Sequence, residues 1–271
     1  MKFGIDVSRH QGWPENPQFP SPPPDWDVLV GQGVLWAGIR ASIGDYYIDP
    51  MFDENYDNAK RVGIIPIPYW VLQTNLDSDA QAAKYIEALE GRDTWMDVAD
   101  VEVLHSGSKT SRGKVLHYAL AAISEETHAM QAIYTAKGFW DAFMPSGFIE
   151  DFSNRWLWVA SYGVNNGEIP PTPPYPRIPD IWEQKGWGAW QYTDKGTLDG
   201  VSSKSVDLDL MQDNLYAALR VRSGIPEPGI VVPPPIPPDP PPTTDLEERV
   251  EELENQVAWI KTWGESFPTD E

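Results

Sequence analysis

The chain has 271 residues, of which 41% are hydrophobic and 23% charged, so it has ordinary globular usage and can bury a core. Lys and Arg number 20 against 41 Asp and Glu, and the formal net charge of −21 disfavours nucleic acid and anionic lipid as partners. The absence of cysteine excludes disulfide scaffolds, thiolate metal sites and Cys nucleophiles.

The N-terminus begins directly with a strand-like run after Met1, so we expect no signal peptide. The longest apolar stretch, residues 63–72, is too short to cross a bilayer and contains Pro66 and Pro68. The sequence therefore predicts a soluble protein that has no membrane partner and no export signal of its own.

Residues 1–224 alternate short apolar runs with helical patterns. The predicted strands cover residues 3–7, 34–41, 64–71, 95–103, 131–135, 157–162 and 188–192. The predicted helices cover residues 26–32, 49–62, 77–90, 109–128 and 208–221. Strands that alternate with helices indicate parallel βαβ units, and about 220 residues of this pattern predict an α/β fold, an irregular TIM-like β/α barrel. We expect mostly strands and loops in the last third, where residues 163–185 are rich in Pro.

A proline-rich linker is predicted at residues 225–244, where ten of twenty residues are Pro. This composition favours a stiff polyproline spacer of roughly 60 Å, and a PxxP ligand for a partner domain is the alternative. Residues 245–271 follow as a short coiled-coil helix and tail. Apolar residues repeat there with spacings of four and three: Leu246, Val250, Leu253, Val257 and Ile260.

The segment 246–260 is too short to be stable alone, so it must pack on the barrel or on other copies of the chain. The long spacer favours a homo-oligomer. Arg249 at heptad position g can pair with Glu254 at position e of a parallel neighbour, and residues 249–254 are similar to a short trimerisation motif. We expect a trimer, and Val at a with Leu at d keeps a dimer open.

Acidic side chains stand at the ends of predicted strands, where barrels of this class hold their functional groups. Asp6 ends the first strand, Asp207 follows the last short strand, and Asp100 and Glu102 end the fourth. Residues i and i+2 of a strand share a face, so Asp100 and Glu102 should be close and the pKa of one should rise. A protonated acid beside a carboxylate is the pair that glycosidic cleavage requires.

Each of these acids also has a structural interpretation. Isolated acids at strand ends usually cap helices or form loop ion pairs, and Asp207 is well placed to cap a helix that begins at residue 208. Asp93 and Asp97 are expected to be solvated or capping. The four histidines lack metal-ligand spacing and no Gly-rich phosphate loop is present, so no metal or cofactor is predicted. His10 is expected to be structural.

Aromatic residues gather at the predicted strand ends. Flat rings can stack on sugars, and the polar tips of Tyr and Trp can fix sugar hydroxyls, while core packing is the alternative for each. The candidates are Tyr69, Trp70, Tyr134, Tyr162, Trp190 and Tyr192.

Motifs along residues 1–220 resemble, in their order, the glycoside hydrolase family 25 lysozymes, the Chalaropsis-type muramidases common in phage endolysins. They include Gly4-Ile5-Asp6-Val7-Ser8, Gln11-Gly12, Asp25-Trp26, Ile39-Arg40-Ala41-Ser42, Pro68-Tyr69, Asp100-Val101-Glu102, Ile133-Tyr134-Thr135, Leu157-Trp158-Val159-Ala160, Trp190-Gln191-Tyr192 and Val206-Asp207-Leu208. Two features depart from the family: residues 12–24 are a Pro-rich insertion, and Trp70 stands where the family often has His. We expect both to reshape the cleft rim.

The resemblance implies a peptidoglycan hydrolase that cleaves the β-1,4 bond between N-acetylmuramic acid and N-acetylglucosamine. It implies Glu102 as general acid and Asp100 as its partner carboxylate, with Asp6 and Asp207 as the remaining acids of the cleft. The positions that match the sugar site are Arg40, Tyr69, Tyr134, Tyr162 and Gln191, and Trp190 joins them as an aromatic candidate.

The details of the reaction stay open at this point. A carboxyl pair two residues apart fits the short separation of retaining enzymes, in which Asp100 either attacks the sugar or orients its 2-acetamido group to attack. The rival function is a glycan-binding or virion structural module without turnover, and the presence of all four acids favours an enzyme. We expect the protein to be made in the host cytoplasm and released through a holin, or to be carried on a phage particle, and to act on the cell wall.

Overall fold

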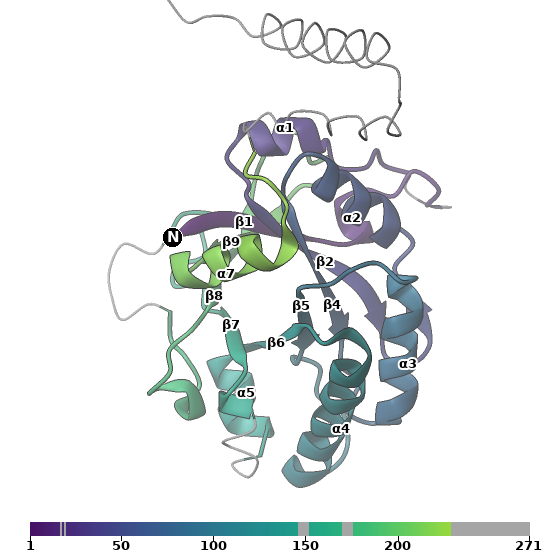
Figure 1. The fold of residues 1–271 in the computed structure, drawn as a ribbon. Coiled ribbons are helices and arrows are strands. Elements are labelled where there is room, and N and C mark those ends of the chain that lie inside the picture. The colour runs from purple at the N-terminus through teal and green to yellow at the C-terminus, as the bar shows by residue number, and fades with distance from the viewer. Residues whose placement is uncertain (17, 19, 146–151, 170–175, 229–271) are drawn as a thin grey trace, which may run out of the picture. The chain divides into compact units, whose positions relative to one another are not determined.

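The computed structural model describes residues 1–16, 18, 20–145, 152–169 and 176–228. Within them, strands and helices alternate from the N-terminal strand to the closing helix (Figure 1). The predicted coiled-coil helix and all of the predicted linker except residues 225–228 lie outside the described residues. No helix of the described part is long and apolar enough to cross a membrane.

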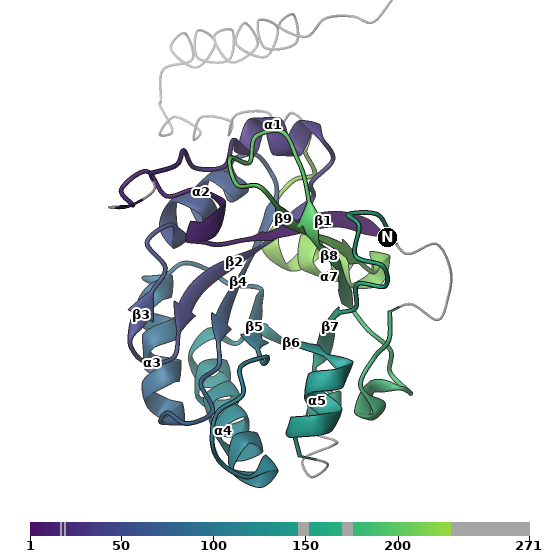
Figure 2. The same cartoon turned by 180° about the vertical axis from the view of Figure 1, so that it is seen from behind.

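The strands form a closed eight-stranded barrel, which confirms the predicted fold class (Figure 2). The order around the ring is β1-β9-β8-β7-β6-β5-β4-β2, and β1 pairs with β2 to close it, while the short β3 extends β2 alone. The strands are β1 (Lys2–Val7), β2 (Trp36–Ile43), β3 (Tyr47–Ile48), β4 (Ile65–Val71), β5 (Met96–Asp100), β6 (Met130–Ala136), β7 (Trp156–Ala160), β8 (Ala189–Gly196) and β9 (Val206–Met211).

Pairing is parallel from β1 through β2 to β8, whereas β9 runs antiparallel to both of its neighbours. The prediction of a helix from residue 208 was therefore wrong, because residues 206–211 form β9 and α7 (Asp213–Ser223) begins after them. Side chains of alternating character in Val206–Met211 have the period of a strand. No helix crosses between β8 and β9, so the chain returns in the opposite direction.

The other helices surround the barrel, and α1, α3 and α4 begin at capping side chains. The N-cap carboxylate of Asp77 accepts hydrogen bonds from two backbone N–H groups of α3, and Ser108 caps α4 in the same way. The helices are α1 (Trp26–Gly31), α2 (Phe52–Arg61), α3 (Ser78–Leu89), α4 (Lys109–Thr127) and α5 (Lys137–Phe143), with 3-10 turns at Arg9–Gln11 and Asp180–Trp182. The sequence did not predict α5, whose single buried side chain, Trp140, gives no periodic signal.

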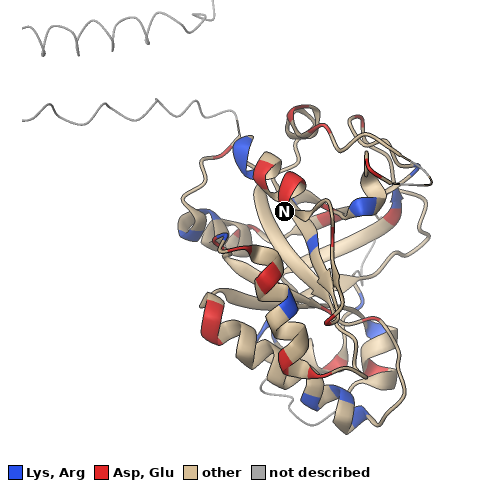
Figure 3. Cartoon of the chain, turned by 90° about the vertical axis from the view of Figure 1, so that its right-hand side faces the viewer, with Lys and Arg blue, Asp and Glu red and all other residues tan. Residues whose placement is uncertain are grey.

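Lys and Arg alternate with Asp and Glu over the outer helices in Figure 3 rather than gathering in one basic patch.

Two apolar cores lie on the two faces of the barrel strands. The outer core, between strands and helices, contains Trp70, Ile133 and Val159, whereas the lumen contains Trp36 and Trp158. Successive side chains of a strand point to opposite faces, so neighbours in sequence enter different cores. Because both faces are apolar, the alternation of polar and apolar residues that marks most strands is weak here.

The floor of the lumen depends on one glycine. The rings of Trp36 and Trp158 meet edge to face with centroids 5.2 Å apart. A Cβ atom at Gly38 would lie 2.3 Å from the Trp158 ring and 2.9 Å from the Cβ of Asp6. Only a residue without a side chain therefore allows Asp6 and Trp158 to occupy the same layer of the barrel.

The packing of the barrel continues past the predicted boundary at residue 224. Ile225 is buried in the cluster that α7 forms at one end of the lumen. The guanidinium of Arg220 donates hydrogen bonds to the carbonyls of Ile225 and Pro226, at 3.2 and 2.9 Å. The first residues of the Pro-rich stretch are thus part of the compact unit.

Candidate active site

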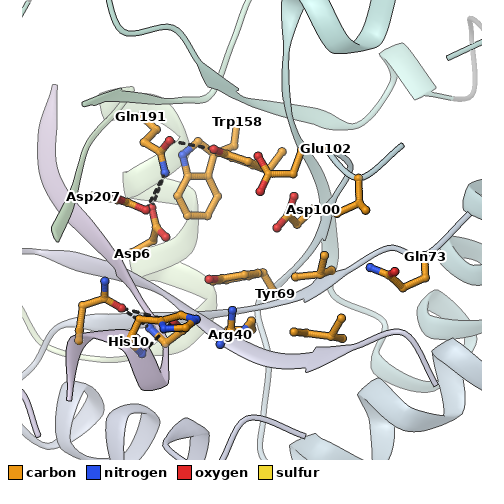
Figure 4. Close-up of a pocket in the computed structure, with 16 residues that line it drawn as sticks. Asp6, His10, Arg40, Tyr69, Gln73, Asp100, Glu102, Trp158, Gln191 and Asp207 are labelled. Atoms are coloured by element: carbon orange, nitrogen blue, oxygen red, sulfur yellow. Dashed lines mark hydrogen bonds between the residues drawn. The ribbon is translucent and has the colours of Figure 1, made fainter. Parts of the chain in front are cut away.

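A pocket of about 410 Å³ opens at the end of the barrel where the parallel strands finish (Figure 4). This is the edge at which barrels of this class place their functional groups. Predicted site residues from seven strands and one following loop line it: Asp6, Arg40, Tyr69, Asp100, Glu102, Tyr134, Gln191 and Asp207.

Two pairs of acids face each other across this pocket. Asp100 and Glu102 lie on one wall, while Asp6 and Asp207 lie on the opposite wall, with the indole of Trp158 between the pairs (Figure 4). Asp6 and Asp207 are directly opposed in the antiparallel pairing of β1 with β9. The fold therefore brings the first and last strands of the barrel together to build one half of the site.

The wall that carries Asp100 and Glu102 continues beyond the end of its strand. β5 ends at Asp100, but the backbone N–H of Val101 still donates to the carbonyl of Tyr134, at 2.9 Å. The hydroxyl of Thr135 donates to the carbonyl of Val101 at 2.8 Å. These bonds keep the chain extended through Val101, so Glu102 lines the same pocket as Asp100.

Asp100 is only 6% exposed, and its Oδ1 has no hydrogen-bond partner among the described residues. Burial raises the pKa of Asp100 well above its usual value, and the charges of Glu102 and Asp6 raise it further, while Arg40 opposes them. An unpaired buried carboxyl oxygen costs free energy. This Oδ1 atom is therefore a candidate acceptor for a hydrogen bond from a substrate.

Glu102 keeps its side chain accessible to solvent at the mouth of the pocket. Loss of hydration beside the pocket wall nevertheless raises its pKa above that of a free glutamate. A carboxyl group with these two properties holds its proton more strongly than a free glutamate does and can deliver it to a bound molecule.

Gln191 connects the opposite wall to two phenols. Its amide nitrogen donates to Asp6 at 2.7 Å and to Asp207 at 3.4 Å. Its amide oxygen accepts from the hydroxyl of Tyr134 at 2.8 Å and from that of Tyr162. Tyr162 therefore acts on the site through Gln191, although it is not among the residues that line the pocket.

Asp209 is a buried acid behind this wall that was not among the predicted site residues. It is fully buried, and its Oδ1 accepts a hydrogen bond of 2.8 Å from the indole of Trp158. Burial raises the pKa of Asp6 and Asp209 well above the usual value, and burial together with Asp6 raises the pKa of Asp207 to about 9. The two-residue repeat of a strand could have identified both Asp209 and Trp158 as residues of the lumen, because each lies two positions from another residue that faces the lumen.

We expect these acids to make the fold less stable as pH rises. Their pKa values are raised above the value of about 3.9 in an unfolded chain, so the folded state retains protons that the unfolded state has lost. The stabilisation is complete below about pH 4 and is lost as pH rises toward the pKa of Asp207, about 9. Thermal unfolding should show a lower melting temperature at pH 8.5 than at pH 5, and Asp209→Asn should reduce that difference. An unchanged or higher melting temperature at pH 8.5 would contradict the expectation.

Two aromatic candidates, Trp190 and Trp70, and the acid Asp97 lie away from the pocket, and the candidate Tyr192 is likewise in the outer core. Trp190 is 4% exposed, belongs to the outer core and donates from its indole to the carbonyl of Ser161, at 2.8 Å. Trp70 packs in the outer core against Tyr85, so the expectation that it reshapes the cleft rim was wrong. Asp97, expected to be solvated or capping, is fully buried and accepts from the hydroxyl of Tyr85 at 2.8 Å. All four occupy strand positions that point away from the lumen.

Two histidines lie at the mouth of the site. His10, expected to be structural, lines the pocket, and its pKa is lowered chiefly by burial and by the nearby Arg40 and Arg9. The Nε2 atom of His105 lies 2.7 Å from the amide oxygen of Gln73, which lines the pocket beside β4.

Residues 5–201 match the family described as glycosyl hydrolases family 25. The chain belongs to this family. Lysozyme M1 of Streptomyces globisporus is 29% identical over 226 residues, which cover 79% of this chain and 68% of that protein. The bacterial lysozyme of Streptomyces coelicolor has a TM-score of 0.66 at 26% identity, covering 83% of this chain and 98% of that structure. The catalytic domain of an endolysin from a Listeria monocytogenes bacteriophage shares the fold, with a TM-score of 0.63 at 19% identity over 81% and 97% of the two chains.

Family membership and these relatives make the chain a glycoside hydrolase of the lysozyme type. The family match covers Asp100 and Glu102 but ends before β9, so Asp207 lies beyond the matched range.

Proposed function

We propose that this glycoside hydrolase is an N-acetylmuramidase that cleaves the β-1,4 bond between N-acetylmuramic acid and N-acetylglucosamine in bacterial peptidoglycan. The observation that carries the proposal is the carboxyl pair of Asp100 and Glu102 on one wall of the pocket, opposite Asp6 and Asp207. Membership of a family whose relatives include lysozymes supports the substrate class.

In this proposal Glu102 is the general acid and then the general base. Its raised pKa favours the protonated carboxyl more than in a free glutamate, and its position at the pocket mouth gives it access to a leaving oxygen and then to water. Protonation of the glycosidic oxygen breaks the bond to the sugar, and the same carboxylate later takes a proton from the attacking water.

Asp100 is proposed to stabilise the positive charge that develops on the sugar. Burial raises the pKa of both carboxyls, and the charge of Glu102 raises the pKa of Asp100 further. Positive charge on the sugar favours the anion of Asp100, and the unpaired Oδ1 can accept a hydrogen bond from the N–H of a 2-acetamido group. That bond would hold the acetamido oxygen against the anomeric carbon, and direct attack by Asp100 is the alternative route.

The remaining pocket residues are proposed to position the sugar. Arg40 is fixed by an ion pair of 2.8 Å to Asp49, and Tyr69 and Tyr134 present rings and hydroxyls to the pocket. Gln191 holds Asp6 and Asp207 in place, so those two acids act as electrostatic and orienting groups.

Digestion of purified peptidoglycan, followed by mass spectrometry of the new reducing ends, tests the proposal. We expect new ends that carry N-acetylmuramic acid. New ends that carry N-acetylglucosamine would show that the enzyme cleaves the other glycosidic bond of the strand. The absence of new ends would favour the alternative, a glycan-binding or virion structural module without turnover.

Oligomerisation through residues 246–260, as a trimer or a dimer, stays a prediction from the sequence pattern. The same holds for a phage or holin-dependent setting.

A further inference from the structure

The Pro-rich insertion forms a second hollow beside the active site. Described residues of this insertion, from Trp13 to Ser21, line a space of about 540 Å³ together with the turn that follows β1. Its lining includes Arg9, His10, Trp13 and Ser21. Because His10 lines both this hollow and the active-site pocket, the two spaces are neighbours.

Hydrogen bonds hold the wall of the hollow in place. The backbone of Trp13 and residue Ser21 exchange two bonds of 3.0 and 3.1 Å across the insertion. The hydroxyl of Ser202 donates to the carbonyl of Pro22 at 3.0 Å, which joins the insertion to the segment before β9. The backbone of Gly12 also packs closely on Pro22. A Cβ atom at position 12 would lie 2.1 Å from the carbonyl oxygen of Pro22.

The guanidinium of Arg9 lines the hollow and has no acidic partner among the described residues. Asp49, the acid next to Arg9, accepts only a backbone N–H from it at 3.2 Å, while its carboxylate pairs with Arg40 at 2.8 Å. No ion pair of the Arg9 guanidinium is found among the described residues, and no acid lines the hollow. In a chain with a net charge of −21, an unneutralised Arg beside the active site indicates an anionic ligand.

Two aromatic rings fix the position of this guanidinium. It lies 5.5 Å from the ring centroid of Trp13 and 5.0 Å from that of Tyr47. Stacking of this kind orients the planar guanidinium of Arg9 before a ligand binds. Its N–H groups match the geometry of a carboxylate. His10 and Ser21 add polar groups to the same lining.

We propose that this hollow binds a carboxylate of the peptide stem attached to the muramic acid residues of the glycan strand. The inference rests on the proposed muramidase function. A stem leaves the sugar sideways from the strand, so its acidic groups reach surfaces next to the pocket that holds the sugar. The insertion would then make this enzyme prefer peptidoglycan that carries stems with free carboxylates.

The test compares cleavage of two soluble substrates that are free of phosphate-bearing wall polymers. One is glycan strands with acidic peptide stems, and the other is the same strands after their carboxylates have been converted to neutral amides. We expect the wild type to show a kcat/KM about five- to tenfold higher on the acidic strands, mostly through a lower KM. Arg9→Gln should remove this preference and leave cleavage of the amidated strands unchanged, and Arg9→Lys should retain part of it.

Lys114→Gln, which removes one exposed positive charge from α4, is the matched control and should keep the preference. Equal kcat/KM of the wild type on both substrates would overturn the inference and leave the muramidase function standing. An equal loss on both substrates in Arg9→Gln would show a structural role and also overturn it. A dependence of the rate on Arg9 that appears only when a phosphate-bearing polymer is left on the strands would also overturn the inference. Release of no reducing ends from either substrate would overturn the proposed function and the inference together.

Discussion

Replacing Glu102 by Gln is expected to slow peptidoglycan cleavage by about 10²- to 10⁴-fold, the usual contribution of general acid catalysis. The amide keeps the shape of the side chain but has no proton to give. Because Glu102 is exposed at the pocket mouth, the free energy of unfolding should change by no more than about 0.5 kcal/mol. The measurements are the initial rate of reducing-end release and a thermal unfolding curve of the same preparation.

Glu125→Gln is the matched control for this variant, since it makes the same chemical change at an exposed position of α4. It should cleave at the wild-type rate. A Glu102→Gln enzyme that retains more than about half of the wild-type rate would remove Glu102 from the role of proton donor.

Replacing Asp100 by Asn is expected to lower the rate by about 10²- to 10³-fold, the scale seen when one electrostatic group is removed from an active site. The fold should be as stable as the wild type, or more stable above neutral pH. The reason is that burial raises the pKa of Asp100, so its ionisation costs free energy in the folded state. Rate and stability should therefore change in opposite directions, which separates this variant from a simple loss of structure.

A modified substrate distinguishes the two roles of Asp100. If Asp100 orients the 2-acetamido group, strands without N-acetyl groups on muramic acid should be cleaved slowly by the wild type. On those strands Asp100→Asn should cause little further loss. Fast cleavage of the same strands by the wild type, with a large further loss in the variant, would instead indicate direct attack by Asp100.

The sequence predicted the barrel and its acids because both depend on features that are local in the chain. Alternating apolar runs and helices define parallel βαβ units, and strand ends in such units meet at one edge. Asp6, Asp100, Glu102 and Asp207 therefore line one pocket, although their separation in sequence is large. The tight sequence spacing of Asp100 and Glu102 was enough to place them on the same wall.

The side on which an aromatic residue lies could not be predicted in the same way. Trp70 and Trp190 neighbour Tyr69 and Gln191, yet the tryptophans pack in the outer core while their neighbours face the pocket. In a barrel covered by helices both faces of a strand are apolar, so composition does not reveal which residue points inward.

β9 and the buried Asp209 were difficult for a related reason. The segment Val206–Met211 alternates with the period of a strand, but Leu208 also lies three and seven positions before Met211 and Leu215, which is a helical spacing. Pairing with β1 and β8 decides between the two patterns and places Asp209 against the indole of Trp158.

The pairing of β1 with β9 also has a consequence for biosynthesis. A ribosome delivers Asp6 among the first residues of the chain, but its partners Asp207 and Gln191 emerge only near the end of the barrel. Until residues 206–211 have left the exit tunnel, β1 and β8 lack their pairing with β9 and the wall that carries Asp6 lacks Asp207. A nascent or prematurely terminated chain therefore cannot contain the assembled site, and the hydrolase first becomes complete when nearly the whole barrel has been made.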